Sequence, residues 1–195
     1  MAEKILPLFA TPVLHMTEVG MDLKKLKKFI LNTKKMNDGR TLTNVGGWQS
    51  NDLQHKPNEE LQKFIEILKG VATRYSIGIE IEPKNKLEQI WANVNGPKDF
   101  NERHKHLNAI YSGVYFVDVP ENSGNFSLTH NVPDFNFAWC HFNGIKIKKY
   151  NAFNAGTWNI KPQADELFLF PSWAEHKVTP NLSNSDRISI SFDLS

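Results

Sequence analysis

The chain has 195 residues and a net charge of +2, and 40% of its residues are hydrophobic. This length suits one domain, and the composition supports a packed core instead of a disordered chain. The small net charge gives no indication of nucleic-acid binding, and no apolar run reaches the roughly 18 residues that a membrane span needs. The only cysteine, Cys140, cannot form an internal disulfide, and the N-terminus lacks a signal-peptide pattern, so we expect a cytoplasmic protein.

Two helices are predicted in the first part of the chain. Residues 21–35 carry Leu23, Leu26 and further aliphatic residues at helical spacing, with lysines between them. Residues 57–76 carry a second apolar stripe of the same period. We therefore expect about residues 1–78 to form a helical support for the rest of the chain.

The pattern changes after residue 78, where short runs of β-branched and aromatic residues alternate with turn residues. Such a pattern is typical of a β-sandwich or barrel, and the jelly roll is the natural member of that class. We expect a mainly β protein with N-terminal helices, in which residues 1–195 form one domain and about residues 79–195 form its core. The predicted strands are 79–82, 88–94, 110–118, 125–129, 146–150, 157–160, 166–170 and 187–193.

A first candidate metal-binding element is His104-Lys-His106, which lies just before the predicted strand at 110–118. On an extended backbone alternate side chains point to the same side, so the two imidazoles can form two arms of a metal site. A pair of exposed histidines in a loop is the alternative explanation, and an HxH pair alone does not decide between the two.

A second candidate is His176, which follows the apolar strand predicted at 166–170. A lone histidine after a strand is more often structural than a ligand. His176 gains weight because it is distant in sequence from His104 and His106, as ligands from different strands of a folded sheet would be.

The last predicted strand has one polar and one apolar face. Arg187, Ser189 and Ser191 alternate with Ile188, Ile190 and Phe192. The polar face either points to solvent or forms a carboxylate site, because a guanidinium group can bind a carboxylate through two hydrogen bonds and a serine hydroxyl can add another.

These elements together resemble the Fe(II)- and 2-oxoglutarate-dependent oxygenases, and in particular a branch found in bacteria and phages. That family combines an HxD/H pair, a distant histidine and an R-x-S element about ten residues later. The resemblance covers nearly the whole chain. The matching segments are Leu8 to Val13, Gly46 to Ser50, Trp91 to Asn93, His104 to His106, Ser112 to Val117, Pro120 to Gly124, Leu169 to Asn181 and Arg187 to Phe192.

The resemblance implies a double-stranded β-helix, a cupin-like jelly roll, with iron near one open end. By matching position, His176 is the distal iron ligand, and Arg187 with Ser189 holds the far carboxylate of 2-oxoglutarate. The pair departs from the usual His-x-Asp/Glu because its second member is His106. Either the iron has three histidine ligands, which we favour, or only one member of the pair binds it and water fills the vacant position.

Many relatives also place a tyrosine hydroxyl near the co-substrate from the strand that here reads Tyr115-Phe116. We therefore expect Tyr115 in the co-substrate site, unless residue 116 is the inward position. In that case Tyr111 or Asn93 would take the place of this hydroxyl. Trp91 and Trp173 either line the pocket or pack in the core, and core packing is the more common role.

The activity implied is that of a dioxygenase, which hydroxylates its substrate with release of succinate and CO2 and is often assisted by ascorbate. The substrate, a small molecule or a peptide, cannot be named from the sequence, and a homodimer is left open. The expected location is the cytoplasm of a bacterium or of a phage-infected host cell. The alternative is a cupin-like metal protein with three histidines that does not use 2-oxoglutarate; the R-x-S element argues against it.

Overall fold

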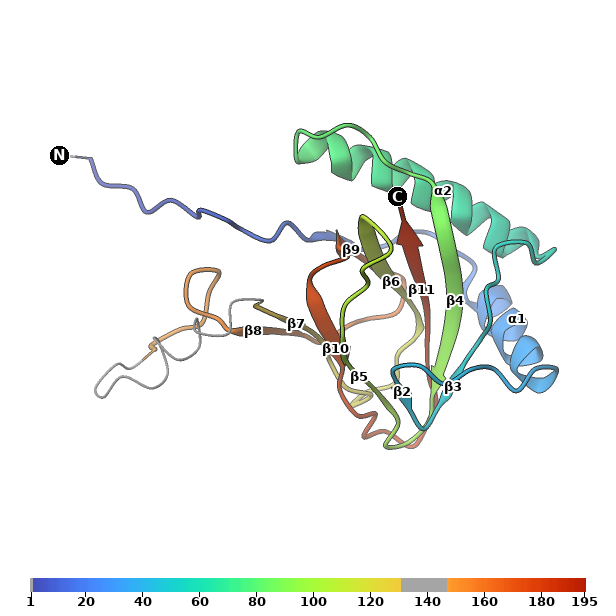
Figure 1. Ribbon diagram of the computed structural model, residues 1–195. Coiled ribbons are helices and arrows are strands. Elements are labelled where there is room, and N and C mark those ends of the chain that lie inside the picture. The colour runs from blue at the N-terminus through green and yellow to red at the C-terminus, as the bar shows by residue number, and fades with distance from the viewer. Residues whose placement is uncertain (1, 131–146) are drawn as a thin grey trace.

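In the computed structural model, which describes residues 2–130 and 147–195, two antiparallel β-sheets pack against each other (Figure 1). Cys140 and His141 lie outside the described residues. The six-stranded sheet has the order β1 (Leu14–Met16), β9 (Glu166–Pro171), β6 (Tyr111–Asp118), β11 (Arg187–Leu194), β4 (Leu87–Asn95) and β3 (Trp48–Gln49). The five-stranded sheet has the order β2 (Asn44–Val45), β5 (Phe100–His104), β10 (Glu175–Val178), β7 (Phe126–Thr129) and β8 (Thr157–Ile160).

Both predicted helices are confirmed, as α1 (Leu23–Lys35) and α2 (Glu59–Gly78). Each begins at a side chain that accepts a hydrogen bond from a free backbone N–H of the first turn. Asp22 accepts from Lys25 at 3.0 Å, and Asn58 accepts from Leu61 at 2.9 Å. Such caps define where the helices start, and the apolar stripes then direct them onto the sheet.

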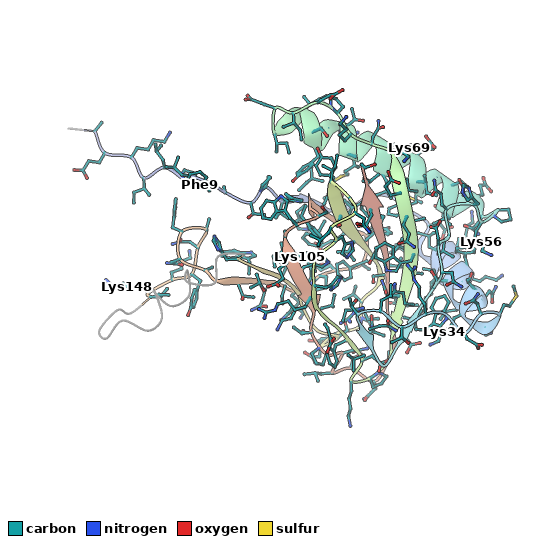
Figure 2. All side chains as sticks on the ribbon, viewed as in Figure 1. Phe9, Lys34, Lys56, Lys69, Lys105 and Lys148 are labelled. Carbon is teal, nitrogen blue, oxygen red and sulfur yellow. The ribbon has the colours of Figure 1, made fainter. Side chains whose placement is uncertain are left out.

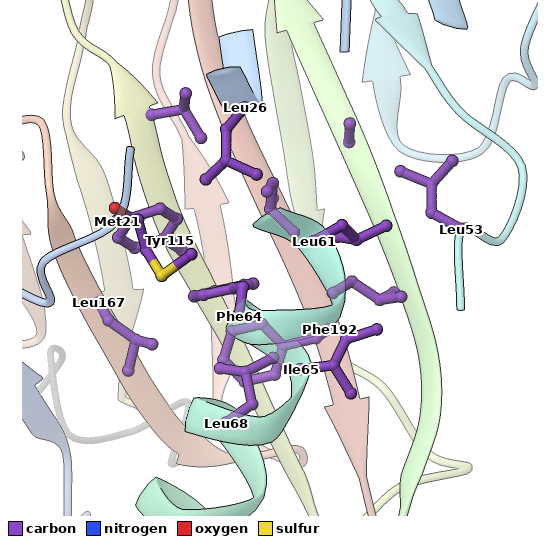
Figure 3. Close-up of a cluster of buried hydrophobic side chains, with 14 of the residues drawn as sticks. Met21, Leu26, Leu53, Leu61, Phe64, Ile65, Leu68, Tyr115, Leu167 and Phe192 are labelled. Atoms are coloured by element: carbon purple, nitrogen blue, oxygen red, sulfur yellow. The ribbon is translucent and has the colours of Figure 1, made fainter. Parts of the chain in front are cut away.

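The larger hydrophobic core lies between the two helices and the outer face of the six-stranded sheet (Figure 3). Phe64 of α2 is central to it, with ring centroids 4.7 Å from Tyr115 of β6 and 6.2 Å from Phe192 of β11. A smaller cluster lies between the sheets and includes Phe126 and Phe170. Because most apolar burial lies on the helix side, the inner faces of the sheets have room for polar side chains.

Some predicted strands differ from the observed ones. No strand forms at 79–82, because α2 continues to Gly78 and Glu80 then adopts φ of 59° in a turn. The described part of the strand predicted at 146–150 is also irregular, and residue 146 lies outside the described residues. Conversely β5 and β10 were not predicted, and β1, β2 and β3 bring strands from the first 78 residues into the sheets.

Residues 2–13 extend away from the sheets, with Phe9 fully exposed near the middle of this arm (Figures 1 and 2). Neither helix of the described ranges has the length and apolar content required to cross a membrane.

Candidate metal centre

Three histidines meet between the sheets. His176 of β10 lies directly opposite His104 at the end of β5, and His106 follows two residues after that strand. The ring centroids are 4.3 Å apart for His104 and His176, 5.0 Å for His104 and His106, and 5.2 Å for His106 and His176. One ring nitrogen from each histidine lies within 4.8 Å of the others, so the three nitrogens can approach a single ion. This is the convergence that the sequence predicted.

The backbone around His106 explains why it stays beside the strand-borne pair. The His106 N–H donates to the carbonyl of Ser172 at 2.9 Å, and the Ser172 N–H donates to the carbonyl of Ile110 at 2.9 Å. These bonds tie the turn after β5 to the turn before β10. Lys105, between the two histidines, is exposed (Figure 2), as the alternation of an extended segment predicts.

Each histidine has its Nδ1 atom occupied by a hydrogen bond. The Nδ1 of His104 donates to the Glu102 carbonyl at 2.7 Å, and that of His176 donates to the Ala174 carbonyl at 2.9 Å. A carbonyl oxygen can only accept, so these two rings carry the proton on Nδ1 and leave Nε2 free. The Nδ1 of His106 lies 2.6 Å from Oδ1 of Asp193. The Nδ1 atoms of all three rings thus have hydrogen-bond partners, which leaves Nε2 as the nitrogen available to a metal, the arrangement that metal-binding histidines adopt.

Burial keeps two of these histidines neutral. Desolvation, together with a smaller effect of the neighbouring His104, lowers the pKa of His176 to about 3. Desolvation also lowers the pKa of His104, while its hydrogen bond to Glu102 opposes that shift. A metal ion binds only the neutral imidazole, so His104 and His176 are in a binding-competent state at physiological pH.

A cavity of about 540 Å³ opens onto the histidines. Its wall is apolar on one side, where Phe126 and Phe170 pack near His176 with centroid distances of 6.1 and 4.8 Å. Another part of the wall is polar and includes Asn93 and Ser189. Apolar walls with a few convergent polar groups are typical of small-molecule sites.

Arg187 is buried beside this cavity, with 1% of its surface exposed, but it is not among the residues of the cavity wall. Its Nη1 donates to the carbonyl oxygens of Ser123 and Thr179, the latter at 3.2 Å. Within the described residues its Nη2 has no hydrogen-bond partner. Burial lowers the pKa of Arg187 to about 10, and Asp99 opposes the shift, so the guanidinium stays charged.

Ser189 of β11 and Asn93 of β4 face each other across the ladder. They lie one inward-facing position beyond Arg187, in the direction of the histidines. The Asn93 amide donates to Ser191 at 3.1 Å, whereas its buried Oδ1 has no partner in the described part of the chain. An unpartnered arginine nitrogen and an unpartnered amide oxygen in one buried region indicate that a polar ligand belongs there.

Tyr115 does not reach this region. Its hydroxyl donates to Asp165 at 2.5 Å, and its ring packs on α2 on the other face of the sheet. Burial, followed by the hydrogen bond to Asp165, raises its pKa. The inward residue is Phe116, and Tyr111 also points outward, to Ser76 at 2.8 Å. Alternation along β6 therefore corrects the expectation for Tyr115 and leaves Asn93 as the polar group at this position.

Of Trp91 and Trp173, the two tryptophans considered for the pocket wall, Trp91 lines the cavity. Its ring centroid lies 5.7 Å from that of His106. Trp173 lies in the turn before β10 and is 47% exposed.

Among the polar residues of the site that were not predicted are Asp193 and Arg40. Asp193 contacts His106, and it continues the alternation of Arg187, Ser189 and Ser191 by one more step, so extending that pattern would have found it. Arg40 lines the cavity, with its guanidinium carbon 5.8 Å from the centre of the Trp91 ring. It lies in a long polar segment, where no sequence pattern indicated a role.

Comparison with known families gives one match, the family described as "Putative 2OG-Fe(II) oxygenase", over residues 89–193. This range contains all three histidines and Arg187. A search of the curated proteins gives no significant match.

Similar solved structures include a prolyl-4-hydroxylase from Pseudomonas putida, with a TM-score of 0.63 and 12% identity over 94% of this chain and 92% of that one. A prolyl hydroxylase from Trichoplax adhaerens, bound to a peptide fragment of hypoxia inducible factor, has a TM-score of 0.67 and 14% identity, over 93% of this chain and 82% of that one. The viral collagen prolyl hydroxylase of Paramecium bursaria Chlorella virus-1, in complex with 2-oxoglutarate, has a TM-score of 0.57 and 11% identity, over 93% of this chain and 94% of that one. These likenesses confirm the double-stranded β-helix fold.

Proposed function

Because the chain belongs to the family of 2OG-Fe(II) oxygenases, we propose that it hydroxylates a small-molecule or peptidyl substrate at an iron held by His104, His106 and His176. The family establishes the protein as an oxidoreductase that uses Fe(II) and 2-oxoglutarate. The convergence of three imidazoles on one point is the observation that carries the assignment of the iron ligands.

The donor set suits Fe(II). Neutral imidazole is a good ligand for Fe(II), and rings whose Nδ1 atoms are already hydrogen-bonded need no reorientation to bind it. The phenylalanines beside His176 keep that side of the centre apolar, which limits access of water. The resulting centre has no carboxylate among its ligands, unlike the more common His-x-Asp arrangement.

The co-substrate site is proposed to consist of Arg187, Ser189 and Asn93. Nη2 of Arg187, which has no hydrogen-bond partner among the described residues, is a buried charged donor that a carboxylate of 2-oxoglutarate would satisfy. Ser189 adds a hydroxyl one inward position closer to the histidines. Asn93 is placed to orient the ligand between Arg187 and the histidines, because its side-chain amide can rotate and present either its oxygen or its nitrogen.

When bound, iron and 2-oxoglutarate supply the oxidising chemistry, in which O2 is consumed, 2-oxoglutarate becomes succinate and CO2, and the substrate gains one oxygen atom. The residues of the chain position and shield this reaction. Arg187 fixes one end of the co-substrate, the Nδ1 hydrogen bonds hold the imidazoles in place, and Phe126 and Phe170 exclude water from one wall. The 540 Å³ cavity leaves room for a small molecule or for one side chain of a peptide.

Formation of succinate tests the activity. Purified protein supplied with Fe(II), ascorbate, O2 and isotopically labelled 2-oxoglutarate is expected to release labelled succinate slowly, even without its substrate. His176→Ala should abolish this release, whereas His15→Ala, which removes a histidine stacked on Phe168 outside the cluster, should not. If wild-type protein neither binds nor converts 2-oxoglutarate, the oxygenase proposal fails and the cupin-like alternative is favoured.

Anaerobic Fe(II) titration of three alanine variants tests the ligand set. Replacement of His104, His106 or His176 should weaken Fe(II) binding in every case, because each removes one donor from a centre with three. Unchanged affinity in one variant would remove that histidine from the ligand set.

A further inference from the structure

Within the described ranges, a carboxylate, that of Asp193, is hydrogen-bonded to one ring of the histidine cluster. The Nδ1 of His106 lies 2.6 Å from Oδ1 of Asp193, and both side chains are largely buried, with 16% and 15% of their surfaces exposed. The corresponding acceptors of His104 and His176 are neutral backbone carbonyls. His106 therefore differs from the other two in having a carboxylate as its acceptor.

Asp193 is held rigidly by the sheet. It lies on β11 between Gln89 of β4 and Ser112 of β6 in the two ladders. The Ser112 hydroxyl donates to the same Oδ1 at 2.7 Å and lies 3.1 Å from the His106 ring nitrogen. A carboxylate on a central strand with a second hydrogen bond cannot easily turn away from the imidazole, so its contact with His106 is built into the fold.

We propose that Asp193 is a positioning residue for the metal centre, which accepts the Nδ1 proton of His106 and thereby commits Nε2 of that ring to the metal. The inference rests on the proposed three-histidine centre. A carboxylate acceptor fixes the tautomer, orients the ring and makes its free nitrogen more basic. A charge-assisted hydrogen bond is also stronger than one to a neutral carbonyl.

Asp193 further compensates for the missing carboxylate ligand. Three neutral imidazoles leave both charges of a divalent ion uncompensated among the ligands. Together, the three imidazoles and Asp193 carry the same charge as two imidazoles and one carboxylate, while Arg40 of the same cavity wall interacts electrostatically with both Asp193 and Asp52. The negative charge is moved outward by the width of one imidazole ring, and it stays in a largely buried region where solvent screens it weakly.

Anaerobic Fe(II) calorimetry on matched variants tests this role. Asp193→Asn keeps the size of the side chain but removes its charge, and we expect Fe(II) affinity to fall about 10- to 100-fold. Glu88→Gln removes a carboxylate from the same cavity wall, where its partners are Lys86 and Ser195, and should change the affinity less than about twofold. An Asp193→Asn affinity within twofold of wild type would overturn the proposal.

A double variant separates positioning from a general effect of charge. If Asp193 acts through His106, the loss of Fe(II) affinity caused by Asp193→Asn should be several-fold smaller when His106 is already glutamine, because only the direct effect of the charge then remains. An equal loss in both backgrounds would show that Asp193 acts through space or through the fold, and would overturn the proposal.

A measurement on metal-free wild-type protein needs no variant. Nitrogen-15 NMR at a pH above the ordinary titration range of imidazole reports which ring nitrogen carries the proton. We expect His106 to be protonated on Nδ1, whereas the Nε2-protonated form would overturn the proposal. Because this result depends neither on turnover nor on 2-oxoglutarate, it also separates a failure of the inference from a failure of the proposed function.

Discussion

Burial and hydrogen bonding fix the chemistry of the cluster one residue at a time. His176 is 7% exposed, between strands on both sides, and desolvation holds its pKa near 3. In the absence of metal, this burial destabilises the folded protein in acid solution, because the same histidine would be protonated in an unfolded chain. A metal ion replaces the missing proton as the partner of Nε2.

The metal-free protein should therefore lose stability as the pH falls. An unfolded chain protonates His176 below an ordinary pKa of about 6.5, whereas the folded chain resists protonation until about pH 3. Folding thus releases a proton within this window, so the free energy of unfolding rises with pH between these values, by up to about 1.4 kcal/mol per pH unit from this residue. The lowered pKa of His104 has the same sign.

Urea denaturation of chelator-treated protein at a series of pH values measures this slope. His176→Gln should flatten it between about pH 3 and 6.5, because the titrating group is gone. A variant with the slope of the wild type would show that other groups produce the acid sensitivity.

Arg187→Lys should weaken 2-oxoglutarate binding to the metal-loaded protein about 10- to 100-fold. Lysine keeps the charge but loses the guanidinium fork, and one charge-assisted hydrogen bond in a buried site accounts for a loss of this size. Calorimetric titration measures it. Arg103→Lys is the control, since Arg103 is exposed and pairs with Glu175 at 3.5 Å; equal affinities for both variants would remove Arg187 from the co-substrate site.

At the scale of elements, strand β6 is shaped by a missing side chain. Gly113 lies between the outward-facing Tyr111 and Tyr115, where a Cβ atom would come within 2.3 Å of the Phe192 ring and 2.7 Å of the Phe168 carbonyl. The glycine thus lets Phe192 of the neighbouring strand pack into the helix-side core.

Gly113→Ala should destabilise the protein by about 1–3 kcal/mol, because the added methyl overpacks a region that cannot expand freely. Gly78→Ala is a matched control at the end of α2, where a Cβ would meet nothing within 4 Å, and should be neutral or slightly stabilising. Urea denaturation compares the two. A Gly113→Ala variant as stable as wild type would show that Phe192 can move aside.

Elements with a strong pattern could be predicted from the sequence, and those that carry the histidines could not. Both helices and the long strands β4, β6 and β11 have clear apolar periodicity. Strands β5 and β10 read FNERH and EHKV around the ligands. They are short and mostly polar and are held by pairing with distant strands, which no local pattern reveals.

The direction of individual side chains was the other limit. The alternation on β11 indicated which residues share a face, and the polar face does point toward the site. On β6 both faces are apolar, because one packs on the helices and the other on the second sheet, so alternation could not decide between Tyr115 and Phe116. Only the packing of α2 on Tyr115 resolves this choice.

At the scale of the whole molecule, the larger hydrophobic core and the metal site lie on opposite sides of the six-stranded sheet. The helices bury the outer face of the six-stranded sheet, and the inner face meets the second sheet around the histidines (Figure 1). Losses of packing on the two sides should therefore have different consequences for the metal site.

Phe64→Leu and Phe170→Leu test this separation. Each should lower the free energy of unfolding by roughly 1–2 kcal/mol, because each loses buried contacts. Only Phe170→Leu should also weaken Fe(II) binding, since the Phe170 ring centroid lies 4.8 Å from that of His176 while Phe64 packs on the helix side. Denaturation measures the stability of each variant, and calorimetry on the same samples measures its Fe(II) affinity. Equal Fe(II) affinities in the two variants would contradict the separation of the larger core from the metal site.

An anaerobic crystal structure with Fe(II) and 2-oxoglutarate tests the central assignment most directly. We expect one iron peak in anomalous difference maps, within bonding distance of Nε2 of His104, His106 and His176, and a co-substrate carboxylate on the free Nη2 of Arg187. Iron bound away from one of these histidines, or 2-oxoglutarate with no contact to Arg187, would contradict the assignment.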